Sequence, residues 1–260
     1  MSSGTAVRSS VHCVTQEDVA FVTLCAPPLN ILTAEMMLEL AASVETAQHE
    51  PAIKAIVLQA EGRAFSAGAD VGEHRPDKAP EMISAFSHLF SVLGASELPI
   101  VAVVDGAALG AGFELAMMAD ILLASTNATF GQPEIRIGFF APVAVAWLAR
   151  RVGAGRAIEI TARGRVYTAE EMSGFGLVSR VVSREALPTA LEEVLSDLRR
   201  ASGAVMRMNV RLTREFLGRP FEEARREAER VFLHDLMQTD DVHEGIASFF
   251  EKRSPVWSNR

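Results

Sequence analysis

The sequence has few cysteines, few aromatic residues and no cluster of basic residues. It contains two cysteines and one tyrosine among 260 residues, and aromatic residues make up 7% of the chain. Cys13 and Cys25 form no C-x-x-C pair and the six histidines are scattered, so neither a disulfide framework nor a zinc site is expected. We therefore predict no bound metal and a reducing, cytoplasmic environment.

Long apolar segments are also absent from the sequence. No stretch approaches the roughly 18 apolar residues of a membrane-spanning helix, and residues 1–10 lack the apolar core of a secretory signal. We expect a cytoplasmic protein with a frayed N-terminus and no membrane partner. The net charge of −8 and the absence of a Lys or Arg run argue against nucleic-acid binding, which needs a basic surface.

The first two thirds of the sequence contain short apolar runs, which are followed by glycine-containing turns. Four segments are typical of strands: residues 19–24, 55–60, 100–104 and 120–124. The second and third are continuously apolar, as in strands that are buried on both faces. Because helical segments alternate with these strands, we predict an α/β core with parallel strands.

Helical patterns dominate the last third of the chain. An early helix is expected after Thr33 as N-cap, with a buried face that contains Met36, Met37, Leu40 and Val44. Later helices are expected over residues 143–151, 155–162, 168–174, 187–201, 221–238 and from Val242. We predict a core of residues 1–195 and a C-terminal helical region, residues 196–260, that packs on the core or on a neighbouring subunit.

Two glycine-containing turns point to chemistry. The segments Arg63-Ala-Phe-Ser-Ala-Gly-Ala-Asp70 and Asp105-Gly-Ala-Ala-Leu-Gly-Ala-Gly-Phe-Glu114 each follow a predicted strand, and the second opens a helix. Small residues let the backbone approach a ligand, and N–H groups at a helix start stabilise an oxygen that becomes negative. A tight turn is the simpler interpretation of the first segment alone. A dinucleotide-binding turn in the second would need a G-x-G-x-x-G spacing and a following acidic residue, which are missing.

Two glutamates follow successive strands beside these turns. Glu114 lies in the first turn of the predicted helix, and Glu134 follows the next strand in Phe130-Gly-Gln-Pro-Glu134. Parallel connectivity would bring both to one edge of the sheet. Two carboxylates at one site repel each other, so one should retain a proton at neutral pH, which supplies an acid and a base together. Taken singly, each glutamate fits an exposed helix-start or loop position equally well.

These motifs resemble those of the crotonase (enoyl-CoA hydratase/isomerase) superfamily over about residues 19–255. The matching stretches are residues 64–70, 105–114, 130–134, 169–178 and 250–253. The resemblance implies an α/β fold, in which a spiral of ββα turns carries a C-terminal helical region for trimerisation, and a homotrimer or hexamer. It also implies a hydro-lyase of the enoyl-CoA hydratase type. In such an enzyme the N–H groups of Ala69 and Ala111 bind the thioester carbonyl, Glu114 deprotonates water and Glu134 protonates the α-carbon.

The resemblance also implies ligand contacts. Coenzyme A enters as part of the substrate, and no metal or redox cofactor is required. Arg63 and the main chain at Ala67 correspond to the region that holds the nucleotide part of CoA, and Lys252 to a phosphate contact from a neighbouring subunit. Ordinary surface charge is an equally good interpretation of both cations.

The sequence departs from the common hydratase pattern in two places. Ala111 stands where glycine is usual, but only its N–H is needed for the oxyanion hole. After Glu134, where many relatives have a glycine-rich turn, Pro142 cannot donate a hydrogen bond. We expect Pro142 and the aromatic residues of this segment to shape the acyl pocket, and they are Phe139, Phe140 and Trp147. A core position is the simpler interpretation of any single aromatic residue among them.

Three stretches bear on the acyl group. Residues 27–32, 71–78 and 140–144 are similar to cyclohexa-1,5-diene-1-carbonyl-CoA hydratases of anaerobic aromatic degradation, which implies a flat cyclic dienoyl-CoA as a substrate. The alternatives are a hydratase for the linear enoyl-CoA thioesters of fatty acid metabolism, an enoyl-CoA isomerase that uses one carboxylate, and a noncatalytic acyl-CoA-binding protein. His74, within the second stretch, is interpreted as a solvated loop residue.

Overall fold

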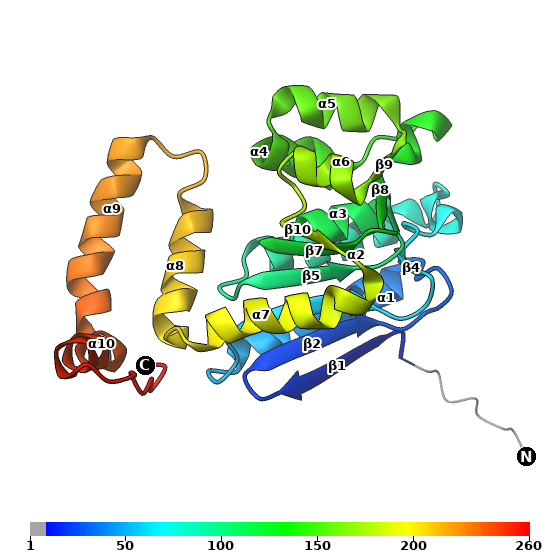
Figure 1. Cartoon of the computed structure of the whole chain (residues 1–260). Helices are drawn as coiled ribbons and strands as arrows, with labels where there is room; N and C mark the ends of the chain where they lie inside the picture. Colours follow the sequence, from blue (N-terminus) through cyan, green and yellow to red (C-terminus); the bar gives the residue numbers. More distant parts are fainter. Residues whose placement is uncertain (1–8) are drawn as a thin grey trace, which may run out of the picture.

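Six strands form the main sheet of the computed structural model, which describes residues 9–260 (Figure 1). Their order is β1-β2-β3-β5-β7-β10, and all neighbours are parallel except the antiparallel pair β1 and β2. The strands are β1 (Val11–Gln16), β2 (Val19–Leu24), β3 (Ala55–Ala60), β5 (Ile100–Val104), β7 (Ile121–Ser125) and β10 (Arg180–Val182). The predicted parallel core is therefore present.

The sequence pattern does not predict β1, and Val19–Leu24 is not the first strand. Five of the six residues of β1 are exposed, so neither an apolar run nor an alternating pattern marks the strand. Ser10 belongs to the segment expected to be frayed, yet its N–H and hydroxyl donate to Glu39 at 3.0 and 2.9 Å. The remainder of that expectation, for residues 1–8, lies outside the described residues.

A second, smaller sheet has the order β4-β6-β8-β9. Its strands are β4 (Ala64–Ser66), β6 (Ala107–Leu109), β8 (Thr129–Gly131) and β9 (Val166–Thr168), and only β9 is antiparallel to its neighbour. The main-sheet strands β3, β5 and β7 each lead through a short turn into β4, β6 and β8. A strand pair followed by helical structure thus repeats along the chain, which is the ββα arrangement that the resemblance implies.

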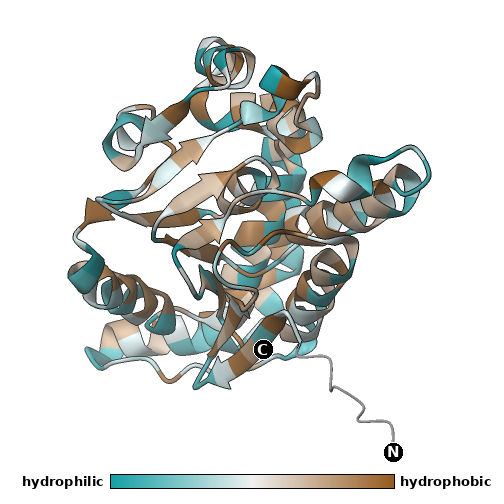
Figure 2. Ribbon diagram, turned by 90° about the vertical axis from the view of Figure 1, so that its right-hand side faces the viewer, coloured by the Kyte–Doolittle hydropathy of each residue, from teal (hydrophilic) through white to brown (hydrophobic). Residues whose placement is uncertain are grey.

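Helices cover both faces of the main sheet. On one face α1 (Ala34–His49) and α2 (Ala79–Gly94) pack against each other, and α3 (Ala111–Met117) joins them in the largest hydrophobic cluster. On the other face α7 (Leu187–Arg199) packs through Leu187, Ala190 and Leu195 (Figure 1). Figure 2 shows the most hydrophobic residues concentrated on the strands between these layers.

The early helix α1 agrees with the sequence prediction. The hydroxyl of Thr33 accepts a hydrogen bond from the N–H of Met36 at 3.2 Å, so Thr33 is the N-cap. The predicted face of Met36, Met37, Leu40 and Val44 is buried. The sequence pattern does not predict α2, which has no N-cap hydrogen bond from a side chain.

Shorter helices surround the smaller sheet. Residues Ala144–Leu148 form a π-helical turn that continues into α4 (Ala149–Val152), in place of the regular helix expected over 143–151. They are followed by α5 (Ala154–Arg163) and α6 (Ala169–Gly174), both as predicted. The side chain of Thr168 caps α6, and Glu171 completes a capping box.

Three C-terminal helices project away from the two sheets (Figure 1). They are α8 (Gly203–Glu215), α9 (Phe221–His234) and α10 (Asp240–Glu251). The helix expected over 221–238 ends at His234, and the sequence pattern does not predict α8, in which only Gly203 is buried. The projecting part starts after α7 ends at Arg199, a few residues beyond position 196. No helix within residues 9–260 is both long enough and apolar enough to cross a membrane.

Candidate active site

Two glycine turns lie against each other at the ends of β4 and β6. Gly68 and Gly110 have φ angles of 111° and 55°, a backbone conformation that favours glycine. A Cβ atom on Gly68 would lie 3.2 Å from the carbonyl oxygen of Leu109 and 3.9 Å from the nitrogen of Ala111. The structure therefore brings together the two segments that the sequence predicts to form one site.

The N–H groups of Ala69 and Ala111 are both unused by the fold. Leu32 pairs with the flanking positions, since its N–H donates to Gly68 at 2.9 Å and its carbonyl accepts from Asp70 at 3.0 Å. Ala111 is the first residue of α3, where an N–H has no partner within the helix. Within the described part of the chain neither N–H has an acceptor. This pair is free to bind an oxygen.

Glu114 is buried in the first turn of α3, with 1% of its surface exposed. Its Oε1 accepts hydrogen bonds from the N–H groups of Val143 and Ala144, both at 2.8 Å. The pKa of Glu114 is raised to about 7, chiefly by burial and also by the nearby Glu134 carboxylate, while the two N–H donors oppose the rise. Glu114 is therefore poised to exchange a proton near neutral pH.

Glu134 faces the same site from the 3-10 helix Pro133–Ile137. A Cβ on Gly110 would overlap Oε1 of Glu134, so the carboxylate rests directly against the glycine turn. Partial burial raises the pKa of Glu134, and a backbone hydrogen bond and the nearby His74 oppose this rise. The two glutamates predicted from the sequence thus meet at one place, and burial raises the pKa of both carboxyl groups.

Gln132 is a site residue that the sequence interpretation missed. It is 1% exposed, and its amide nitrogen donates to Oε1 and Oε2 of Glu134 at 3.1 and 2.9 Å. This orientation is assigned because the amide oxygen would otherwise face the carboxylate. The sequence gives one indication that Gln132 belongs to the site, because Gln132 lies two residues before Glu134 and follows a predicted strand. The amide fixes the direction of the Glu134 carboxyl group.

A pocket of about 600 Å³ opens in front of both glutamates. Its polar side chains are His74, Glu114, Glu134 and Arg136, and the rest of the lining is apolar or backbone. The apolar wall comes mainly from α2 and from the segment after Glu134, and it includes Ala67, Met82, Ile83, Phe86, Phe139, Phe140 and Pro142. Three of the four residues predicted to shape an acyl pocket therefore line this one.

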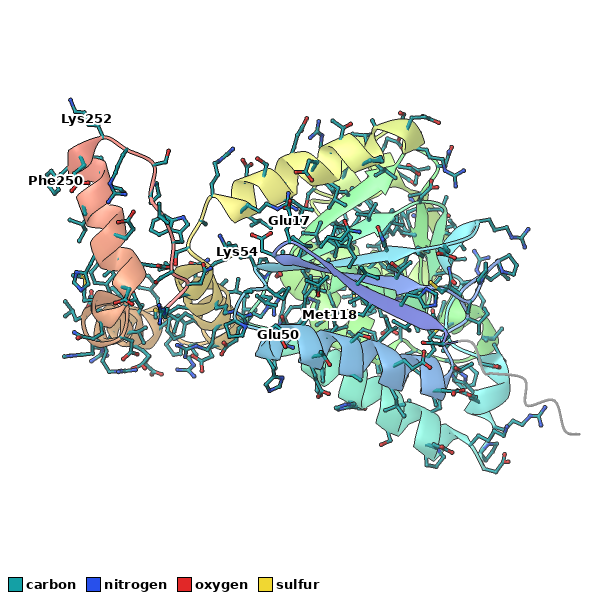
Figure 3. All side chains as sticks on the ribbon, turned by 90° about the horizontal axis from the view of Figure 1, so that it is seen from below. Glu17, Glu50, Lys54, Met118, Phe250 and Lys252 are labelled. Atoms are coloured by element: carbon teal, nitrogen blue, oxygen red, sulfur yellow. The ribbon has the colours of Figure 1, made fainter. Side chains whose placement is uncertain are left out.

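Trp147, Arg63 and Lys252 lie elsewhere. Trp147 lines an adjoining cavity of about 360 Å³, and its buried indole Nε1 has no hydrogen-bond partner among residues 9–260. Arg63 is exposed and does not line the pocket. Lys252 caps α10 at the far end of the projecting helices, away from the sheets (Figure 3). Within one chain, neither cation reaches the pocket.

His74 lines the pocket rather than standing in solvent, which differs from its interpretation as a solvated loop residue. It is half-buried, and its Nδ1 lies 2.9 Å from the carbonyl oxygen of Asp70. The sequence gives no periodicity or motif that would have indicated this position. No group of three or more His, Cys, Asp or Glu residues within 9–260 is arranged to hold a metal ion.

Comparison with known sequences gives matches over nearly the whole chain. Residues 14–260 match the family described as enoyl-CoA hydratase/isomerase. A probable enoyl-CoA hydratase of Mycobacterium bovis is 35% identical over 248 residues, which cover 93% of this chain and 95% of that protein. A cyclohexa-1,5-dienecarbonyl-CoA hydratase of Thauera aromatica is 35% identical over 237 residues, 91% of this chain and 92% of that protein.

Solved structures match the fold equally widely. An enoyl-CoA hydratase subunit I of Geobacillus kaustophilus has a TM-score of 0.88 and 32% identity, covering 96% of this chain and 98% of that one. The Pseudomonas aeruginosa protein DspI has a TM-score of 0.91 and 26% identity, covering 99% of this chain and 100% of that one. These likenesses confirm the α/β fold of ββα turns that the resemblance implies.

Proposed function

Since the chain belongs to the enoyl-CoA hydratase/isomerase family and is a hydro-lyase of the enoyl-CoA hydratase type, we propose that Glu114 and Glu134 add water to an α,β-unsaturated acyl-CoA thioester. The observation that carries this proposal is the meeting of two carboxyl groups and two unused N–H groups at one apolar pocket. Each part has a separate chemical task.

The N–H groups of Ala69 and Ala111 bind the thioester oxygen. Addition of hydroxide to the β-carbon places negative charge on that oxygen, and two preorganised donors stabilise the charge without reorientation. The loss of one such donor typically costs about 10²–10³ in rate. The oxyanion hole thereby makes the β-carbon electrophilic.

Glu114 accepts a proton from water, and Glu134 donates a proton to the α-carbon. With its pKa near 7, Glu114 is a stronger base than an ordinary carboxylate, and its Oε1 is already oriented by Val143 and Ala144. The raised pKa of Glu134 favours the protonated form that a donor needs. Water supplies both the hydroxyl and the replacement proton, so no cofactor is required.

We propose that the acyl group is a flat ring, as in cyclohexa-1,5-diene-1-carbonyl-CoA. Phe86, Phe139 and Phe140 line the pocket, and aromatic walls suit a planar conjugated ring. The similarity to the Thauera aromatica protein supports the same choice, and it would place the enzyme in aromatic degradation. The alternative substrate is a linear enoyl-CoA. The similarity to the Mycobacterium bovis protein, at the same 35% identity, supports this alternative to the same degree.

Coenzyme A binding and assembly are part of the proposal. We propose that Arg63 and the backbone at Ala67 hold the nucleotide part of CoA, and that Lys252 of a neighbouring copy meets a phosphate. A trimer or hexamer would bring the C-terminal helical region, predicted over residues 196–260, against other copies and carry Lys252 toward a site. Free thiols at Cys13 and Cys25 fit a reducing, cytoplasmic location.

The test is the loss of conjugated thioester absorbance with crotonyl-CoA and with cyclohexa-1,5-diene-1-carbonyl-CoA. Wild type, Glu114→Gln and Glu134→Gln are compared in parallel. Fast turnover of the cyclic diene that either substitution abolishes is expected. Turnover of crotonyl-CoA alone would indicate a linear enoyl-CoA hydratase. Activity that survives Glu114→Gln would favour an isomerase, and CoA binding without turnover would indicate a noncatalytic acyl-CoA-binding protein.

A further inference from the structure

The edge strand β1 directs part of its backbone away from the sheet. In its antiparallel pair with β2, the N–H of Cys25 donates to the carbonyl of Ser10 at 2.7 Å, and the register continues with Val11 opposite Leu24. Hydrogen-bonded and non-hydrogen-bonded positions alternate along an antiparallel pair. The even-numbered residues of β1 therefore bond to β2, and the backbone groups of the odd-numbered residues point outward. The outward positions are Val11, Cys13 and Thr15.

Two of these three residues keep their outward groups free. The N–H of Val11 donates to the Glu39 carboxylate at 3.1 Å, and its carbonyl accepts from the hydroxyl of Ser9 at 2.7 Å. Cys13 and Thr15 have no such bond, so within residues 9–260 the N–H and C=O groups of both residues are unpaired. Both residues are exposed, and β1 forms the outer edge of the sheet between α7 and α1 when the molecule is seen from below (Figure 3).

This edge lacks the features that usually protect an exposed strand. Such features are charged side chains, proline and a β-bulge. Val11–Gln16 contains no Asp, Glu, Lys, Arg or Pro, and its register with β2 runs without a shift. Val14 in its middle is 52% exposed. The edge is therefore open to pairing with a further strand, the mode of recognition in which backbone bonds supply the affinity.

We propose that β1 pairs with β1 of a second copy of this chain, antiparallel and across a two-fold axis at Val14. Cys13 then lies opposite Thr15 of the other copy, and each such pair exchanges both N–H···O=C bonds. All the free groups of both copies are satisfied, and Val11 keeps its existing bonds. A register centred on Cys13 would instead place Thr15 opposite Val11, whose outward groups are already used.

The side chains fit the same register. At the axis Val14 faces its own copy in a non-hydrogen-bonded pair, where Cα atoms are about 4.5 Å apart, so its exposed surface becomes buried. His12 lies opposite Gln16, and these two side chains can hydrogen-bond to each other. The first carboxylate after the strand, Glu17, lies opposite Val11. Because no like charges face each other, the strand is complementary to itself, which favours a second copy over a different partner.

This contact is separate from the projecting helices, which begin after Arg199. A two-fold contact gives each assembly an even number of chains. If the projecting helices form the proposed trimers, pairing through β1 joins two trimers into a hexamer. The inference rests on neither the proposed reaction nor the acyl group.

The first test is the mass of the assembly at micromolar concentration, measured by light scattering. Val14→Lys places two ammonium groups against each other at the axis, and Thr15→Pro removes an outward N–H that β2 does not use. We expect either variant to have half the wild-type mass. Thr15→Val is the matched control, because it keeps the N–H and a β-branched side chain, and its mass should equal that of wild type. A wild-type mass of one or three chains, or an unchanged mass for both Val14→Lys and Thr15→Pro, overturns pairing through β1.

Disulfide cross-linking tests the register. In a Cys13→Ser background, Val14→Cys brings two thiol groups together across the axis, within the Cα separation that a disulfide bridges, so oxidation should give covalent dimers. Gln16→Cys in the same background is the matched control, since it lies on the same face of β1 but opposite His12, and it should stay uncross-linked. Absence of cross-linking through Val14→Cys, or equal cross-linking through Gln16→Cys, overturns this register.

Discussion

Burial of Glu114 links its protonation to the pH at which the enzyme works. As the proposed base, Glu114 accepts a proton from water only when it is ionised, and its pKa is raised to about 7. We therefore expect the acidic limb of the kcat/KM profile for crotonyl-CoA to rise with pH through the pKa of Glu114, and a basic limb to follow where Glu134 loses the proton that it donates. The measurement is kcat/KM against pH under conditions in which circular dichroism shows an unchanged fold. A flat profile between about pH 6 and pH 8 would contradict this assignment.

The same burial makes Glu114 costly to the folded state at high pH. Its folded pKa of about 7 exceeds the ordinary glutamate value of 4.5, so between these pH values the folded chain binds more protons than the unfolded chain. The free energy of unfolding must then fall as pH rises through this window, by on the order of 3 kcal/mol in total. An uncharged Gln at this position avoids that loss.

Glu114→Gln should therefore stabilise the protein at pH 8 and have little effect at pH 4.5, while it abolishes hydration. The amide oxygen of Gln can still accept from Val143 and Ala144, so the local structure is retained. Urea unfolding at both pH values measures the difference. Glu223→Gln is the control, because Glu223 also lies in the first turn of a helix but is exposed. An equal change for both variants at pH 8 would argue against a buried charge at Glu114.

Between elements, cationic side chains bind the carbonyl groups at the ends of helices. Arg207 of α8 donates to the carbonyl of Gln48 in the last turn of α1 and to those of Glu50 and Ile53 after it, at 2.9, 2.8 and 3.0 Å. Lys54 donates to the carbonyls of Arg199, the last residue of α7, and of Ala201, both at 2.9 Å. Glu50 and Lys54 lie at the junction between the sheets and the projecting helices (Figure 3). These bonds attach α8 to the core although little of α8 is buried.

Loss of the Arg207 contacts should loosen that attachment. Arg207→Met keeps an apolar stem but leaves three carbonyl groups without this donor, and we expect a loss of about 1–3 kcal/mol in the free energy of unfolding. Urea unfolding gives the value, and hydrogen exchange should show faster exchange in α8 than in α7. Arg226→Met is the control, since exposed Arg226 makes a single contact within its own helix. Equal effects of both substitutions would contradict a role for Arg207 at the junction.

Elements with a buried periodic face could be predicted from the sequence, and those held by long-range contacts could not. The helix after Thr33 and the runs at β3 and β5 follow from local pattern alone. In contrast, β1 is exposed over most of its length, and α8 is attached through Arg207, whose partners lie more than 150 residues away. The three-residue strands of the smaller sheet are too short to show a period.

The residues of the candidate site also fall into two groups, those that the sequence predicts and those that it does not. Glu114, Glu134 and the two glycine turns could be predicted because each lies directly after a strand, where parallel topology fixes its place. Gln132 and His74 reach the site through side-chain orientation, which depends on a turn of 3-10 helix and on contacts such as that with Phe139. Lys252 lies far from the pocket within one chain, so its predicted role depends on assembly.

At the scale of the whole molecule, the projecting helices expose apolar side chains that a single chain does not cover. Phe249 and Phe250 near the end of α10 are each 78% exposed, and Phe221 at the start of α9 is 75% exposed. Figure 3 shows Phe250 beside Lys252 at the tip of this region. Exposed aromatic groups gathered on one projecting part are typical of a protein interface. The proposed homo-oligomer would cover them.

We accordingly expect light scattering of the wild-type protein to give three or six times the chain mass of 28.1 kDa. The double substitution Phe249→Ser, Phe250→Ser should lower this mass, because it removes apolar area that assembly would bury while leaving the core sheets intact. Ile158→Ser is the matched control, since Ile158 is 65% exposed on α5, outside the projecting helices. If the proposed role of Lys252 holds, the disassembled variant should also show a higher KM for acyl-CoA with its fold retained. A wild-type mass of one chain, or an unchanged mass for the double variant, would refute assembly through α10.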